Sequence, residues 1–146
     1  MVDTAQRAIL VAVNDVFFYT KIRDVLLPQG YLIERARTRD DVSVKAVSLQ
    51  PSAVILNMND EKLDAFSALE QVKSDARSKT IPILAFVNHE EVETWRRAKE
   101  LGVTKIVSRN EFSSRTRDLI EEVVASQQAS VNQEQTADVS LEGRPK

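Results

Sequence analysis

The chain has 146 residues, 42% of them apolar, and charges of both signs that leave a formal net charge of −2, so it is long enough to bury the core of one domain. The small net charge argues against general nucleic-acid binding, and the absence of cysteine excludes disulfides and thiolate chemistry. The apolar run Ala8 to Val13 is too short for a signal peptide or a membrane span, so we expect a soluble cytoplasmic protein with no membrane partner.

The first half of the chain alternates short apolar runs with segments of helical period. Ile9 to Val13 is a continuous branched run, as expected for a strand covered on both faces. Asn14-Asp15 then offers a cap for a helix that ends at Pro28-Gln29-Gly30. The sequence next predicts an edge strand over Tyr31–Ala36, a helix over Asp40–Leu49 and a buried strand over Ala53–Leu56.

The second half repeats this alternation. It predicts a helix over Asp64–Asp75 and a long apolar strand over Ile81–Val87. Asn88 and Glu91 have capping-box spacing for a fourth helix, closed by Gly102, that would turn inward Val92, Trp95, Ala98 and Leu101. A fifth strand over Val103–Ser108 follows, and a last helix opening at Asn110 would bury Leu119, Ile120, Val123 and Val124.

Five strand–helix units in succession predict an α/β fold, a doubly wound, five-stranded parallel sheet with helices on both faces. The periodicity stops near Ser126, where a polar segment begins. We therefore expect an N-terminal extension over residues 1–7, a single domain over 8–125 and a disordered tail over 126–146.

Several local motifs stand at characteristic distances within these units. Gly30-Tyr31 precedes the second strand, Asp64-Ala65 opens the third helix, Ile81-Pro82 begins the fourth strand, and Ala98 to Val103 leads into the fifth. In this arrangement the segment from about Ala8 to Val124 resembles the receiver domain of bacterial two-component response regulators. The resemblance implies a flavodoxin-like (βα)5 fold with strand order 2-1-3-4-5.

The functional positions of that family carry different residues in this chain. Receivers have a pair of acids after the first strand, the phosphoacceptor Asp after the third, a Ser or Thr closing the fourth, and an aromatic and then a Lys in the fifth. The residues found at these positions, in the same order, are Val13 and Asn14, Asn57, Val87, Ile106 and Arg109. The resemblance therefore implies a degenerate receiver, or pseudo-receiver.

These substitutions remove the chemistry of phosphorylation. Formation of an acyl phosphate needs a carboxylate nucleophile, and the amide of Asn57 is too weak. Mg²⁺ usually takes one or two carboxylates, so we expect no metal and no other cofactor. Asp15 and Asp60 lie nearby in sequence, but we interpret Asp15 as a first-turn acid that favours the helix dipole and Asp60 as part of a polar loop.

Other candidate residues have ordinary structural explanations. Arg109 could form an anion or small-ligand pocket with Asn14 and Asn57, or it could bond local carbonyls in place of the lost ion network, which we favour. His89 is the only histidine and is expected in a solvated loop, and Trp95 is expected in the core.

A basic surface is the candidate partner face. It would lie on the fourth helix, fifth strand and fifth helix, where receivers dimerise and contact partners, and it comprises Arg96, Lys99, Lys105, Arg115 and Arg117. Glutamates are interleaved with these residues, so a mixed solvated surface is the simpler interpretation.

The sequence thus favours a stand-alone, non-enzymatic receiver domain of signal transduction that binds a protein partner, or itself, independently of phosphorylation. Two alternatives stay open. One is an unorthodox response regulator in which Asp60 or Asp15 accepts phosphate. The other is a flavodoxin-like binder of a small ligand at the same edge of the sheet.

Overall fold

Five parallel strands form the centre of the protein, which the computed structural model describes over residues 7–88 and 91–126. The sheet order is β2-β1-β3-β4-β5, which confirms the predicted α/β fold and strand order. The bounds of the strands are β1 (Ala8–Ala12), β2 (Leu32–Arg35), β3 (Ala53–Asn57), β4 (Ile83–Val87) and β5 (Lys105–Ser108).

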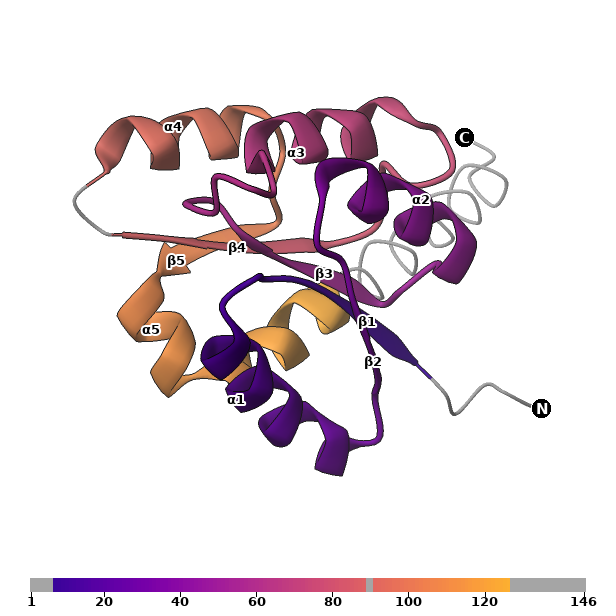
Figure 1. Cartoon of the computed structure of the whole chain (residues 1–146), viewed down its shortest axis with the longest axis vertical. Coiled ribbons are helices and arrows are strands. Elements are labelled where there is room, and N and C mark those ends of the chain that lie inside the picture. The colour runs from indigo at the N-terminus through magenta and orange to yellow at the C-terminus, as the bar shows by residue number, and fades with distance from the viewer. Residues whose placement is uncertain (1–6, 89–90, 127–146) are drawn as a thin grey trace, which may run out of the picture.

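Helices cover both faces of this sheet (Figure 1). In chain order they are α1 (Val16–Leu26) with the short 3-10 turn η1 (Leu27–Gln29), α2 (Arg39–Leu49), α3 (Ala65–Ser74), α4 (Val92–Glu100), α5 (Arg109–Ser114) and a further helical stretch over 116–126. Figure 1 shows α2, α3 and α4 on one face and α1, α5 and the last stretch on the other. The loops that follow each strand therefore meet at one edge of the sheet.

Each face of the sheet buries its own apolar cluster. Alternate strand residues enter the two clusters, as the two-residue period of a strand requires. The face under α1 and α5 is dominated by Phe18, Phe86 and Phe112, and the rings of Phe86 and Phe112 stack with centroids 4.7 Å apart. This packing fixes the position of β4 against the helices below it.

The fourth helix begins differently from the prediction. Its N-cap is Glu91, and Asn88 does not cap it with its side chain. Val92 is 72% exposed and Trp95 is only partly buried, so the predicted inward placement is wrong for Val92 and incomplete for Trp95. Ala98 is the buried residue of this helix, which otherwise carries charged side chains. His89 lies outside the described residues.

The last helix is divided in two. It begins at Arg109 rather than Asn110, because the Ser108 hydroxyl accepts the N–H of Glu111 at 3.0 Å. The helix breaks at Arg115, where the buried hydroxyl of Thr116 donates to the carbonyl of Phe112 at 2.7 Å. In a continuous helix this carbonyl would accept the N–H of Thr116; here it accepts the Thr116 hydroxyl and, at 3.3 Å, the N–H of Arg115.

The ends of the predicted domain lie close to the limits of the described chain. The expected extension over 1–7 and tail over 126–146 fall almost wholly outside it, and residue 126 is still helical. No helix in residues 7–88 and 91–126 is both long and apolar enough to cross a membrane.

Candidate functional site at the carboxyl edge of the sheet

The strand ends bring most of the predicted site positions to one edge of the sheet. Asn57 ends β3, Val87 ends β4, and Arg109 follows β5 directly. Val13 and Val87 are fully buried, and Ile106 is 7% exposed, so these three side chains complete the apolar core. The polar chemistry of the edge therefore rests on the loops rather than on these positions.

Asn57 is a buried polar residue that serves its own loop. Its side chain is 7% exposed, and its Oδ1 accepts the backbone N–H of Asn59 at 3.0 Å. The backbone carbonyl of Asn57 also accepts the N–H of Asp60, at 3.3 Å. This pattern is an Asx turn, in which a short polar side chain replaces a backbone acceptor.

The loop after β1 is held by groups from three other segments. Asp60 Oδ2 accepts the backbone N–H of Asn14 at 3.0 Å, and the Asn14 amide donates to the carbonyl of Arg37 at 3.0 Å. The Arg35 guanidinium donates to the carbonyl of Asn14 at 2.9 Å while lying over the ring of Tyr19. Asn14 thus joins the loops after β1, β2 and β3.

Both nearby carboxylates are already engaged. The other oxygen of Asp60 accepts the N–H of Leu63 at 3.3 Å. The side chain therefore joins its own loop to the loop after β1, where its partner Asn14 lies 46 residues earlier in the chain. Asp15 caps α1 by accepting the N–H of Phe18 at 3.1 Å. That N–H and the neighbouring Arg109 guanidinium hold the pKa of Asp15 below its ordinary value. Asp15 is the N-cap that Asn14-Asp15 was predicted to provide, and not an acid within the first turn, whereas Asp60 is a cross-link between loops.

The side chain of Arg109 contacts Asp15 and Phe18. Its guanidinium is 3.3 Å from Asp15 Oδ2 and 4.4 Å from the ring centroid of Phe18. These contacts are to a carboxylate and an aromatic face, not to the local carbonyls that we expected. Because Arg109 is about two-fifths exposed, this pair contributes little to stability.

The edge lacks the acid cluster of a magnesium site. Mg²⁺ is usually held by one or two carboxylates together with water and phosphate. Here Asp60 is occupied by two backbone N–H groups and Asp15 by a helix cap and a guanidinium. Among residues 7–88 and 91–126, no group of three or more acidic, histidine or cysteine side chains is arranged to hold a metal.

Asn59 is a residue that we did not identify from the sequence. Its amide nitrogen donates to Glu91 Oε1 at 2.8 Å, and its amide oxygen accepts the N–H of Asn88 at 2.9 Å. The side chain therefore connects the β3–α3 loop to the start of α4. No local pattern marked Asn59 in the sequence, because the Asx turn requires only the side chain of Asn57 and a backbone N–H two residues later.

The predicted basic partner face is neutralised by its own neighbours. Arg96 pairs with Glu93 at 2.7 Å and Glu100 at 2.5 Å, and Lys105 pairs with Glu122 at 3.1 Å. Arg115 pairs with Glu111, and Arg117 lies near Asp118. Lys99 differs, because its contact is with the ring of Trp95, whose centroid is 6.0 Å away. This arrangement agrees with a mixed solvated surface.

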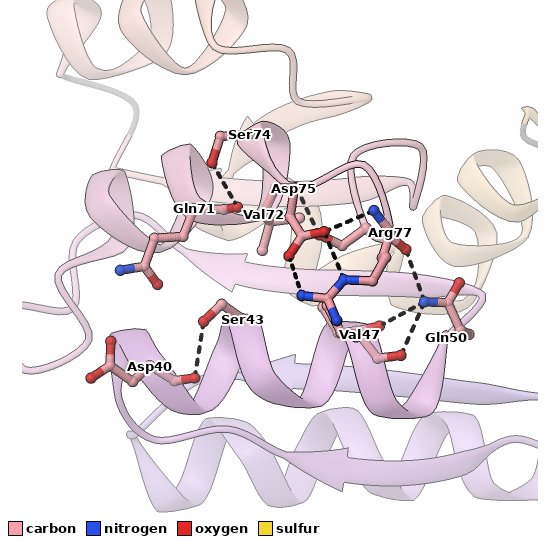
Figure 2. Close-up of polar contacts among 11 residues, drawn as sticks. Asp40, Ser43, Val47, Gln50, Gln71, Val72, Ser74, Asp75 and Arg77 are labelled. Carbon is pink, nitrogen blue, oxygen red and sulfur yellow. Dashed lines mark hydrogen bonds and ion pairs between the residues drawn. The ribbon is translucent and has the colours of Figure 1, made fainter.

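A groove between α2 and α3 is a second place where polar groups gather (Figure 2). It encloses about 730 Å³, and its lining includes Ser43, Val44, Gln71, Ser74 and Asp75. Both serine hydroxyls donate to backbone carbonyls of their own helices, and Asp75 is held by Arg77. These contacts join both serines and Asp75 to their own segments, whereas the buried Gln71 Oε1 in the same lining has no hydrogen-bond partner among the described residues.

Solved structures of other proteins share the fold described above. No protein-family model matches the sequence, and no curated protein matches it. Solved structures do match. The receiver domain of a sensor histidine kinase from Pseudomonas aeruginosa, solved with magnesium in its active-site cleft, is 14% identical with a TM-score of 0.73. The match covers 82% of this chain and 98% of that one.

Two further structures give the same result. The chemotaxis protein CheY4 of Vibrio cholerae is 18% identical with a TM-score of 0.72, and the match covers 81% of this chain and 98% of that one. A response regulator described as putative, from Chloroflexus aurantiacus, is 18% identical with a TM-score of 0.68. That match covers 80% of this chain and 98% of the other. The chain therefore has the flavodoxin-like fold of receiver domains.

Proposed function

We propose that this protein is a receiver domain of signal transduction that binds a protein partner without being phosphorylated. The observation that carries the proposal is the state of Asn57. The residue at the end of β3 is a neutral amide, and its oxygen is bonded to the N–H of Asn59 at 3.0 Å. A group with no carboxylate and with its oxygen engaged is a poor acceptor for a phosphoryl group.

The surroundings of Asn57 support the same proposal. Val87 has no hydroxyl to bond a phosphoryl oxygen, and Asp60 already accepts two backbone N–H groups. A conformational change requires a ligand that distinguishes two states. Without an acceptor or a metal site, the phosphoryl group is not such a ligand for this protein.

The partner surface is proposed to include the carboxyl edge as well as the α4–β5–α5 face. Phe17, in the first turn of α1, is 88% exposed, and its neighbour Val16 is 58% exposed. Exposed aromatic residues are enriched among the residues that anchor protein–protein interfaces. The basic residues of the α4–β5–α5 face would add orientation rather than affinity, because each is paired or lies against its own helix.

Mass spectrometry after incubation with acetyl phosphate and Mg²⁺ tests the proposal. We expect the mass of the intact protein to stay unchanged. An added phosphoryl group would contradict the proposal, and fragmentation would then locate it. The variants Asp60→Asn and Asp15→Asn distinguish the unorthodox-acceptor alternative, since one of them would abolish the modification. A coloured, ligand-loaded protein on purification would favour the small-ligand alternative instead.

A further inference from the structure

We infer that Asn59 is a positioning residue that fixes the start of α4 against the β3–α3 loop without a phosphoryl group. Three bonds meet on this one residue. Its backbone N–H donates to Asn57 Oδ1 at 3.0 Å, its Nδ2 donates to Glu91 Oε1 at 2.8 Å, and its Oδ1 accepts the N–H of Asn88 at 2.9 Å. The residue thus joins the end of β3 to Asn88, after β4, and to Glu91, at the start of α4.

The far end of this link is the first turn of α4. Glu91 is the N-cap residue, and its carbonyl accepts the N–H of Trp95 at 3.2 Å. Its carboxylate does not cap the helix but accepts from Asn59 and from the Thr94 hydroxyl, at 2.8 and 3.2 Å. Asn59 therefore orients the carboxylate of Glu91, which at this position could otherwise cap the helix.

Apolar packing is weak in the first turn of α4. Val92 is 72% exposed, and the apolar contacts of the helix come later, from Trp95, Ala98 and Leu101. The first turn therefore depends on polar contacts for its position. A hydrogen bond to a carboxylate is stronger than one between neutral groups, so the Asn59–Glu91 bond is suited to that task.

Asn57 belongs to the same link because it orients the backbone of Asn59. The order of contacts runs from Asn57 to Asn59, then to Glu91, and then into α4. All of these groups belong to the protein, so the link needs no phosphoryl group to form. The consequence for partner binding rests on the proposed function, but the position of α4 can be tested alone.

Hydrogen exchange of the full chain is the test, with the single tryptophan, Trp95, as a second probe in the same helix. For Asn59→Ala we expect exchange of the α4 amides to accelerate about tenfold, the factor that about 1.4 kcal/mol represents. Asn88→Ala is the matched control, because Asn88 contributes its backbone N–H and keeps it in the variant. Asn57→Asp should also leave α4 unchanged, since a carboxylate accepts the same N–H.

Two outcomes would overturn the inference. One is an Asn59→Ala variant whose α4 amides exchange at the wild-type rate. The other is equal acceleration in β3 and β4, which would show loss of global stability instead of release of α4. Phosphorylation is measured separately, by the mass of the wild-type protein. If that mass stays unchanged and Asn59→Ala leaves α4 exchange unaffected, the link is refuted and the proposed function still stands.

Discussion

Replacing Asp60 by alanine tests whether one carboxylate joins the loops of the carboxyl edge. The side chain accepts the N–H of Asn14 at 3.0 Å and the N–H of Leu63 at 3.3 Å. A hydrogen bond to a charged group contributes about 1.5–3 kcal/mol. Asp60 is partly exposed, and water competes for its hydrogen bonds. We therefore assign the low end of this energy range to the bond with Asn14 and a smaller energy to the longer bond with Leu63. The free energy of unfolding should fall by about 2 kcal/mol.

Urea unfolding followed by the fluorescence of Trp95 measures this loss. Asp60→Asn keeps one acceptor oxygen without the charge, so its loss should be about half as large, about 1 kcal/mol. Glu61→Ala is the matched control, because Glu61 is the adjacent acid, is exposed, and makes no side-chain hydrogen bond or ion pair to the described residues. An Asp60→Ala variant within about 0.5 kcal/mol of wild type would refute the reasoning, since changes of that size are ordinary for surface positions.

Two further predictions concern a turn and a charge. Gly102→Ala and Gly30→Ala both place a side chain at positive φ, +96° and +93°, but only at Gly102 would the new Cβ lie 3.3 Å from Lys73 Cε. Gly30→Ala should lower the free energy of unfolding by about 1 kcal/mol, and Gly102→Ala should lower it by more, because its Cβ would also crowd Lys73. Equal losses in urea unfolding would contradict the role given to Lys73. The pKa of Asp15 is held below its ordinary 3.8, first by the helix N–H that it caps and then by Arg109, so its stabilisation is complete above pH 3.8 and is lost as the pH falls below that value. Acid titration of stability should therefore be less steep in Asp15→Asn, and identical curves would contradict this assignment.

The sequence was sufficient for the fold because strand burial follows from local patterns. The apolar runs of β3 and β4 are buried along their whole length, as continuous runs between two helical layers should be. The motifs at Gly30 and Asp64 were placed correctly as well, since Gly30 ends η1 just before β2 and Asp64 is the N-cap residue of α3. Such signals depend on a few neighbouring residues, and the rest of the chain does not alter them.

The site was less predictable because its contacts join distant segments. Asp60 looked like one acid in a polar loop, yet its partner Asn14 lies 46 residues away. Arg35 and Asn59 carry no motif, and they become important only when the sheet brings four loops to one edge. The start of α4 was misjudged for a related reason, because Glu91 is directed by Asn59 rather than by the local capping pattern.

The most direct test of phosphorylation independence is the amide NMR spectrum recorded with and without beryllofluoride and Mg²⁺. Beryllofluoride occupies the place of a phosphoryl group only where a carboxylate and a metal ion hold it. We predict that the spectrum stays unchanged, because Asn57 provides no carboxylate and the nearby acids are engaged. Shifts concentrated around Asn57 and Val87 would contradict the account.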